Sequence, residues 1–309
     1  MTSRKLSNAF PRKRPKVPPL AASERLELIE CPRDAMQGLK DFIPTADKVR
    51  YLNKLLKVGF HTLDFGSFVS PKAIPQMRDT EAVLAELDWE ESPTRLLAIV
   101  ANLRGAEKAA SLPGVAYLGY PFSVSETFQM RNTRKTIAES QDLVREMLEV
   151  CERGGKTLVV YVSMGFGNPY REAWSAQKVA DFCSQLVDMG VKILSLSDTI
   201  GTSNPQSIDH LFGTLIPAFP QVKFGAHLHT TPGTWREKVE AAFAAGCRRF
   251  DGAIKGFGGC PMAADDLVGN MPMERLVTFA QEVKLHGKLN LLAFESAYNE
   301  ALRVFPSRD

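Results

Sequence analysis

Two histidines separated by one residue follow a strand-like run of the chain. The run is Val222-Lys223-Phe224-Gly225-Ala226, and His227-Leu228-His229 closes it. Because side chains alternate between the two faces of a strand, residues two positions apart point the same way. His227 and His229 would therefore aim two imidazole nitrogens at one point, where they could bind a divalent metal ion. The alternative is a pair of packed histidines, since His-x-His also occurs without a metal.

Two other segments could supply oxygen ligands to the same ion. Glu30-Cys31-Pro32-Arg33-Asp34 ends another strand-like run and carries two carboxylates. A glycine-rich stretch that starts at Gly258-Gly259-Cys260 ends at Gly269-Asn270 and offers an amide oxygen. A divalent cation with two imidazole ligands needs such oxygens from elsewhere in the chain. The three segments together therefore predict a metal site more strongly than the two histidines do alone.

Strand-like runs alternate with helix-patterned segments from Arg25 onward. The eight runs are Leu26–Cys31, Thr62–Phe65, Leu96–Val100, Val115–Pro121, Leu158–Val162, Ile193–Ser197, Val222–His227 and Phe250–Ile254. Helical spacing of apolar residues marks 47–58, 136–152, 175–189, 235–245 and 273–286. Strands separated by helices pair in parallel through right-handed crossovers, so eight such units predict an α/β fold, a (β/α)8 TIM barrel. A doubly wound sheet is the alternative, although its usual nucleotide-binding glycine motif is missing after the first run.

The polar candidates follow the ends of the predicted strands. In a (β/α)8 barrel, catalytic residues lie at the carboxyl ends of the strands and on the loops that follow. The candidates there are, in chain order, Arg33, Asp34, Asp64, Asn102, Asp198, His227, His229, Cys260 and Asn270. An unpaired buried charge is costly, so a cluster of polar residues at one rim is better explained by a functional site than by packing.

Composition sets wider limits on the class of protein. The chain has 309 residues, of which 44% are hydrophobic and 24% charged, as in an ordinary globular protein with an ample core. No apolar run approaches the ~20 residues that a membrane-spanning helix needs, so we expect no membrane partner. Five cysteines without a Cys-x-x-Cys pair favour free thiols in a reducing compartment. We therefore expect a cytoplasmic protein, with an organelle matrix as the alternative. Four of the cysteines lie in apolar patterns typical of packing: Cys31, Cys151, Cys183 and Cys247.

The first twenty residues differ in charge from the rest of the chain. They contain six Lys or Arg and no acid, so their net charge is +6. Because the net charge of the whole chain is +3, the remainder carries −3. A mildly acidic body argues against a nucleic-acid partner. Pro11, Pro15, Pro18 and Pro19 oppose a continuous helix in this segment. We expect residues 1–24 to form a flexible basic arm and 25–309 a single barrel domain. An organelle address or a partner-binding arm is the alternative for the arm.

Six segments that follow the predicted strands form a recognisable set, in order over about residues 25–290. They are Glu30-Cys31-Pro32-Arg33-Asp34-Ala35-Met36-Gln37-Gly38, Gly66-Ser67-Phe68-Val69-Ser70-Pro71-Lys72, Asn102-Leu103-Arg104-Gly105, Ser197-Asp198-Thr199-Ile200-Gly201, His227-Leu228-His229 and Gly256-Phe257-Gly258-Gly259-Cys260-Pro261 to Gly269-Asn270. By these segments the chain resembles the hydroxymethylglutaryl-CoA lyase family, which belongs with the isopropylmalate and citramalate synthases among the metal-dependent barrel lyases. The Phe-Val-Ser-Pro-Lys and Gly-Gly-Cys-Pro segments are typical of the lyases rather than the synthases.

The resemblance implies a metal-dependent retro-Claisen reaction. The ligands would be Asp34, His227, His229 and Asn270, and mixed oxygen and imidazole ligation suits Mg²⁺ or Mn²⁺. The substrate would be an acyl-CoA thioester whose C2–C3 bond breaks after its C3 hydroxyl loses a proton, which yields acetoacetate and the enolate of acetyl-CoA. A metal that lowers the pKa of that alcohol would act as a Lewis acid. We further expect a homodimer.

The resemblance also implies roles for residues around the metal. Arg33 would stabilise the enolate oxygen, as an oxyanion hole does, and Cys260 or His227 would deliver the proton to the enolate carbon. Asp64 would stand where the family carries a catalytic glutamate. Four residues are expected to contact the substrate, of which Gln37 and Asp198 could instead orient the rim loops: Gln37, Ser67, Asn102 and Asp198.

Three departures from the family pattern put the substrate in question. Asp64 is one methylene shorter than the family's glutamate, and Thr230 follows the second histidine where the family has aspartate, which removes an acceptor expected beside a metal ligand. Ala35-Met36-Gln37-Gly38 replaces Gly-Leu-Gln-Asn in the first loop. Another 3-hydroxyacyl thioester could therefore be the substrate. Two alternatives of other classes are a metal-dependent aldolase that acts on a small hydroxy keto acid without CoA, and a degenerate barrel without activity.

Overall fold

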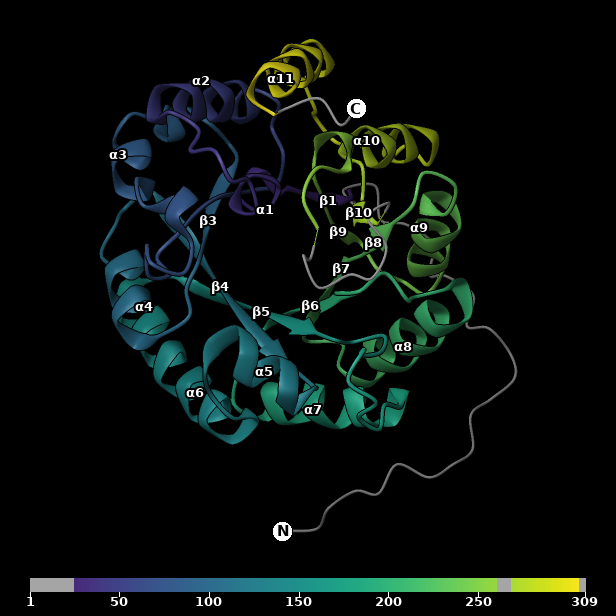
Figure 1. Cartoon of the computed structure of the whole chain (residues 1–309). Coiled ribbons are helices and arrows are strands. Elements are labelled where there is room, and N and C mark those ends of the chain that lie inside the picture. Colours follow the sequence, from purple (N-terminus) through teal and green to yellow (C-terminus); the bar gives the residue numbers. More distant parts are fainter. Residues whose placement is uncertain (1–24, 260–267, 306–309) are drawn as a thin grey trace.

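Eight parallel strands close into a barrel (Figure 1). The structure, a computed structural model, describes residues 25–259 and 268–305. The barrel strands are β1 Glu27–Glu30, β2 Thr62–Ser67, β3 Arg95–Ile99, β4 Val115–Ser123, β5 Thr157–Ser163, β6 Ile193–Ser197, β7 Lys223–His227 and β9 Arg249–Gly252. Because β9 pairs with both β7 and β1, the sheet has no edge. The predicted (β/α)8 barrel is confirmed, and the doubly wound sheet is excluded.

Most of the helices surround the barrel on the outside, whereas α1, Pro32–Gln37, lies inside their ring, close to β1 (Figure 1). The other helices are α2 Thr45–Leu56, α3 Thr80–Ala85, α4 Leu103–Ala110, α5 Glu126–Thr133, α6 Ile137–Gly154, α7 Ala176–Asp188, α8 Pro205–Ala218, α9 Trp235–Ala244, α10 Met273–Glu282 and α11 Leu291–Val304, with short 3-10 turns η1 Pro75–Met77, η2 Trp89–Glu91 and η3 Ile254–Gly256. The five segments with helical spacing correspond to α2, α6, α7, α9 and α10, as predicted. None of the helices in the described part of the chain is long and apolar enough to cross a membrane.

Local sequence explains where the longest helix begins and ends. The Thr136 side chain accepts a hydrogen bond from the backbone N–H of Glu139, whose carboxylate accepts one from the Thr136 N–H, so the two residues form a capping box at the start of α6. Gly155 ends the helix in the left-handed region at φ 63°. Between these caps Val144 and Met147 are buried against the barrel.

The strands face two separate cores. Leu96 and Ala98 of β3 pack outward against the helices, whereas Leu97 and Ile99 point into the barrel. Tyr117, Val159, Tyr161 and Ile193 fill the same interior. On the other side of the barrel the interior is polar. Ser195 of β6 donates to Asp251 of β9 at 3.4 Å, and β7 lies between these strands, so the bond crosses the inside of the barrel.

The end of the second strand differs from its prediction in a way that concerns the site. The sequence places the end of the second strand at Phe65, but β2 continues to Ser67. Asp64 therefore lies inside the strand, not at its carboxyl end. A bulge between Asp64 and Gly66 shifts the pairing with β3. Two predictions, the basic arm at 1–24 and the role of Cys260, lie outside the described residues.

Candidate active site

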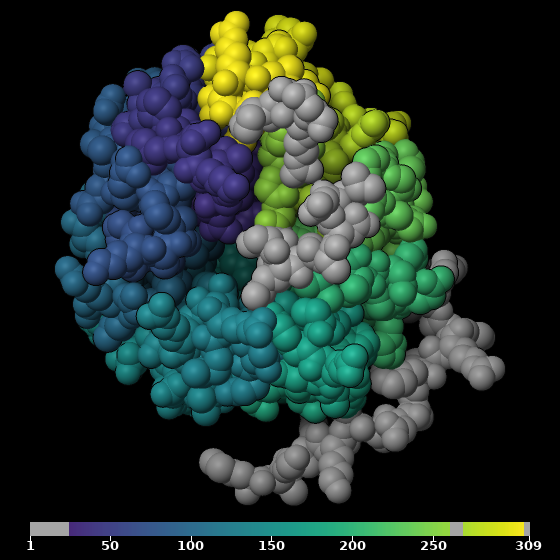
Figure 2. Space-filling view, viewed as in Figure 1, coloured from purple at the N-terminus to yellow at the C-terminus, as the bar shows by residue number. Residues whose placement is uncertain are grey.

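The candidate site lies at the carboxyl ends of β1, β7 and β9. Pro32 starts α1 directly after β1, and its missing N–H costs nothing at this position, so Arg33 and Asp34 are held in the first turn. His227 is the last residue of β7, and His229 begins the two-residue strand β8, His229–Thr230. In Figure 2 the described surface is hollowed at the centre of the ring beside α1.

A second, small sheet brings Asn270 to the histidines. Strand β10, Gly269–Asn270, pairs antiparallel with β8, and Asn270 stands opposite His229. Gly258 makes the close approach feasible: a Cβ there would lie 2.8 Å from the Asp34 carbonyl oxygen and 2.9 Å from Asn270 Nδ2, and its φ is +84°. A side chain at position 258 would therefore collide with Asp34 and Asn270, so glycine is needed there for these two residues to meet.

The predicted metal ligands lie together. Ligand atoms of Asp34, His227 and His229 are all within 4.8 Å of one another. Asn270 Nδ2 donates to Asp34 Oδ2 at 2.7 Å and to the Phe257 carbonyl at 2.9 Å. His229 Nδ1 is buried and has no hydrogen-bond partner among the described residues. Such an unpaired nitrogen costs about 1–3 kcal/mol, and a carboxylate with two imidazoles is a suitable donor set for a divalent ion. The residues present thus fit a metal.

Electrostatics favour the ligand-competent protonation states of two of these residues. Burial alone would raise the pKa of Asp34, but Arg33, His227 and the hydrogen bond from Asn270 together lower it, so the carboxylate stays ionised. Burial, followed by the neighbouring His227, lowers the pKa of His229 to about 4, so its imidazole is neutral at physiological pH. Burial alone would lower the pKa of His227. Asp251, which accepts from His227 Nδ1 at 3.3 Å, outweighs burial and raises it.

Arg33 and Asp64 form a buried ion pair below the metal ligands. The Nε and Nη2 groups of Arg33 donate to Asp64 Oδ2 at 3.0 and 2.6 Å, and Arg33 is 7% exposed while Asp64 is fully buried. Burial raises the pKa of Asp64 to about 6, although Arg33 opposes the shift. The structure thus places Asp64 as the partner that holds Arg33.

Gln37 joins the arginine to the first metal ligand. One turn along α1, its Oε1 accepts from Arg33 Nη1 at 2.7 Å and its Nε2 donates to Asp34 Oδ1 at 3.2 Å. Arg33 Nη1 also donates to Asp34 Oδ1 at 3.1 Å. These contacts agree with the alternative role expected for Gln37, which is to orient residues at the rim and not to bind the substrate.

The other predicted substrate contacts have structural partners. Asn102 caps α4 by accepting from the Gly105 N–H at 2.8 Å, and the Ser67 hydroxyl accepts from the Val69 N–H at 3.2 Å. Asp198 is buried, and it accepts from Ser203 and, at 3.0 Å, from Lys238 Nζ. Their contact with a substrate stays a prediction.

Thr230 does not face the metal ligands. Its hydroxyl donates to the Thr231 carbonyl and shares a hydrogen bond with the Thr234 hydroxyl, both at 2.9 Å, in the turn before α9. Thr230 thus supplies no acceptor to the histidines, and His229 Nδ1 has no partner among the described residues, so the loss of an acceptor beside a ligand stays a prediction.

Sequence reasoning missed Lys238, Arg249 and Asp251. Lys238 is buried on α9 and donates at 2.7 Å to the carbonyl of His229, so it ties Asp198 to the backbone of a candidate ligand. Asp251 lies under His227, and Arg249 donates to it at 2.9 Å. The sequence did mark Arg249 and Asp251, because these two charged residues interrupt the otherwise apolar strand β9.

Replacing Lys238 with methionine is expected to destabilise the fold. Lys238→Met keeps the length of the side chain but leaves the buried Asp198 carboxylate without its cation. Removing one member of a buried pair costs about 3–5 kcal/mol, so the free energy of unfolding in urea should fall by that amount. The double variant Lys238→Met with Asp198→Asn should recover part of the loss. A change below about 1 kcal/mol, the value of an exposed pair, would contradict the burial argument.

A closed parallel barrel with an acid–imidazole cluster and a buried arginine at the carboxyl ends of its strands is the architecture of a barrel enzyme. The HMGL-like family model matches residues 26–300, so the chain belongs to the HMGL-like family. It is an enzyme, a lyase of this family. Members of the family generally depend on a divalent metal.

Three known proteins illustrate the similarity. Hydroxymethylglutaryl-CoA lyase YngG of Bacillus subtilis is 32% identical over 266 residues, which cover 86% of this chain and 88% of that protein. (R)-citramalyl-CoA lyase of Chloroflexus aurantiacus is 32% identical over 256 residues and 80% of each chain. The structure of an HMG-CoA lyase from Acinetobacter baumannii in complex with coenzyme A and 3-methylmalate superposes with a TM-score of 0.83 at 30% identity, and covers 94% of this chain and 95% of that one.

Proposed function

We propose that this enzyme cleaves 3-hydroxy-3-methylglutaryl-CoA, or a close relative, to acetyl-CoA and a 3-oxo or 2-oxo acid with the help of Mg²⁺ or Mn²⁺. The observation that carries the proposal is the Arg33 guanidinium held beside the Asp34, His227 and His229 cluster. Relatives named as lyases of CoA thioesters support it. We also propose that the chain forms a homodimer and works in the cytoplasm or an organelle matrix.

Asp34, His227, His229 and Asn270 would hold the metal. When bound there, a divalent ion supplies Lewis-acid activation of a hydroxyl group. Asn270 would contribute its amide oxygen, because its nitrogen already donates to Asp34 and Phe257. His229, with its lowered pKa, needs to lose no proton before it binds.

Arg33 is arranged to receive negative charge on a thioester oxygen. Its Nε, both Nη1 hydrogens and one Nη2 hydrogen are engaged by Asp64, Asp34 and Gln37. The second Nη2 hydrogen has no partner among the described residues. Because the other bonds fix the guanidinium, this donor is oriented before the reaction and costs no reorganisation when an enolate forms.

The proton that ends the reaction must reach the enolate carbon. His227 offers an imidazole at the same rim and its pKa is raised, but it can deliver a proton from Nε2 only when that nitrogen is not bound to the ion. Cys260, the other candidate, lies outside the described residues. We propose that one of these two residues makes the transfer.

A cavity next to α1 could accept part of the CoA moiety. It has a volume of about 500 Å³ and is lined by the loop after α1 and the end of α11. Its lining residues include Leu39, Lys40, Phe42, Arg303 and Val304. Lys40 and Arg303 could bind phosphate through charge-assisted hydrogen bonds, but Asp41 and Asp47 line the same cavity and offset their charge, so the apolar side chains carry this proposal.

The acyl group is open between two candidates, because a hydroxymethylglutaryl-CoA lyase and a citramalyl-CoA lyase are both 32% identical to this chain. The test is to incubate the purified protein with Mg²⁺ and each thioester and to quantify acetyl-CoA with acetoacetate or pyruvate. EDTA-treated protein is the control. Acetyl-CoA from neither thioester, together with cleavage of a hydroxy keto acid that lacks CoA, would favour the aldolase alternative. No cleavage of any of them would favour the degenerate barrel.

Asp64→Glu is expected to increase cleavage of hydroxymethylglutaryl-CoA. A glutamate extends the carboxylate by about 1.3–1.5 Å from the position at which Asp64 now accepts from Arg33. The reference pKa values of the two acids are close, ~3.9 and ~4.3, so the change tests geometry. The measurement is kcat/KM on this thioester for both forms. No gain in a folded, metal-loaded variant would show that Asp64 fits a different acyl group.

A further inference from the structure

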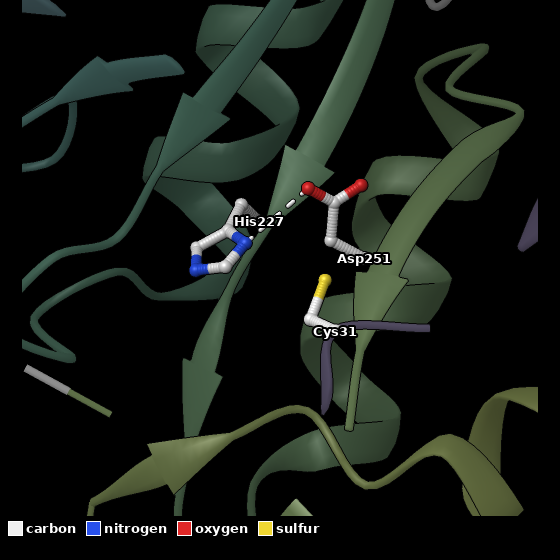
Figure 3. Close-up of side chains that lie close together, drawn as sticks. All are labelled: Cys31, His227 and Asp251. Carbon is white, nitrogen blue, oxygen red and sulfur yellow. Dashed lines mark hydrogen bonds and ion pairs between the residues drawn. The ribbon is translucent and has the colours of Figure 1, made fainter. Parts of the chain in front are cut away.

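A buried cluster below the metal ligands involves His227 a second time (Figure 3). His227, Asp251 and Cys31 point toward one another from β7, β9 and the end of β1. We propose that Asp251, itself held by Arg249, is a positioning residue that fixes the tautomer of His227, so that His227 Nε2 presents its lone pair to the active site. The tautomer of His227 follows from contacts within this chain. Its role in catalysis rests on the proposed function.

Asp251 is fixed from two sides. Arg249 Nη1 donates to Asp251 Oδ1 at 2.9 Å, and the Ser195 hydroxyl donates to Oδ2 at 3.4 Å. Both Arg249 and Asp251 are 2% exposed, so water does not screen this pair. A buried carboxylate paired with a guanidinium is ionised and can only accept hydrogen bonds.

An acceptor at this place decides which nitrogen of His227 carries hydrogen. His227 Nδ1 lies 3.3 Å from Asp251 Oδ2, and since the carboxylate cannot donate, Nδ1 must. The other nitrogen, Nε2, points away from Asp251 in Figure 3 and keeps its lone pair. The ring is also restrained by Tyr161, whose ring meets it edge-on at 5.8 Å and 84°. A histidine fixed in this way can bind a cation or accept a proton without first exchanging its own hydrogen.

The same three side chains could instead hold a metal of their own, because their ligand atoms lie within 4.8 Å of one another. Arg249 argues against this interpretation, since its charge lies against the one carboxylate of the group. Cys31 already donates to the Ile29 carbonyl at 3.6 Å. The two interpretations differ in what they require of Cys31: a metal needs its sulfur, whereas the tautomer of His227 does not.

Asp251→Asn separates these interpretations. Arg249 would continue to face an oxygen of the new amide, so the NH₂ group would be turned toward His227 and Nδ1 would have to accept. Hydrogen would move to Nε2, as happens when the aspartate of a hydrolase triad becomes asparagine. Loss of such a partner typically weakens metal affinity 10–100-fold. Cys31→Ala is the matched control, because it removes the third member of the cluster and leaves Asp251 in place.

The experiment reads the imidazole nitrogens directly. Full-length protein labelled with ¹⁵N-histidine and stripped of metal is examined by long-range ¹H–¹⁵N correlation about two pH units above the ordinary histidine pKa of ~6.5. The His227 signals are assigned by their loss in His227→Gln. We expect Nδ1–H in the wild type and in Cys31→Ala, and Nε2–H in Asp251→Asn, with Mn²⁺ affinity by calorimetry 10–100-fold lower only in the last.

Three outcomes would overturn the inference. They are an Nε2–H tautomer in the wild type, an unchanged tautomer and affinity in Asp251→Asn, or a loss of Mn²⁺ affinity in Cys31→Ala equal to that in Asp251→Asn. If Asp251→Asn does not fold, the wild-type spectrum alone still decides the tautomer. Neither measurement uses a thioester, so a protein that shows Nδ1–H but cleaves no CoA substrate would contradict the proposed function and leave this inference standing.

Discussion

Arg33→Gln is expected to lower kcat by about 10²–10³-fold while Mn²⁺ affinity changes little. Removal of one donor from an oxyanion hole has an effect of this size, because the lost bond strengthens only as charge develops on the oxygen. Arg33 is suited to that role, since three side chains fix its guanidinium and one N–H faces no described partner. Steady-state kinetics with hydroxymethylglutaryl-CoA or the better thioester, and calorimetry with Mn²⁺, check the two halves of the expectation.

Two comparisons make the Arg33 result specific. Arg236→Gln removes an arginine that forms only exposed ion pairs with Glu240 and Glu282 on α9 and α10, and it should leave kcat unchanged. The double variant Arg33→Gln with Asp64→Asn removes the charge that the single change leaves buried. If the double variant folds better but is as slow as the single one, the loss comes from the missing donor. A rise confined to KM would instead make Arg33 a ground-state binding residue.

The fold could be predicted because its signals are local. Apolar runs with turns between them predicted all eight barrel strands, and the amphipathic period of α6 and α7 gave those helices within two residues. The end of β2 was wrong because Gly66 and Ser67 have no strand preference, and the neighbouring strand β3 imposes the extended conformation on them. The pairing of β8 with β10 involves two residues on each side, too few for a periodic pattern.

The sequence could bring forward the four candidate ligands, but not the residues that hold them in place. Asp34, His227, His229 and Asn270 follow from spacing and family resemblance, whereas their partners depend on contacts far apart in the chain. Lys238 and Asp198 are 40 residues apart, and Arg33 and Asp64 are 31 apart. No local sequence pattern predicts that these charged residues pair, because only closure of the barrel brings the strand ends together. The substrate question has the same origin, since the shape of the acyl site depends on these contacts.

His229→Ala is expected to weaken Mn²⁺ binding at least about 100-fold. Loss of a residue that only supports a metal ligand weakens binding by about 100-fold at most, so loss of a ligand itself should exceed that. Three observations point to a ligand: His227 and His229 alternate along the chain, Asp34 beside them is ionised, and the neutral His229 has an Nδ1 atom without a partner among the described residues. Calorimetry on the metal-stripped protein measures the affinity, and circular dichroism checks the fold. His286→Ala, at an exposed histidine outside the site, is the matched control and should bind as the wild type does. His229→Gln keeps more of the buried volume, so it serves if the alanine variant unfolds. Mn²⁺ affinity unchanged in either folded variant would show that the ion, if it binds, uses other ligands.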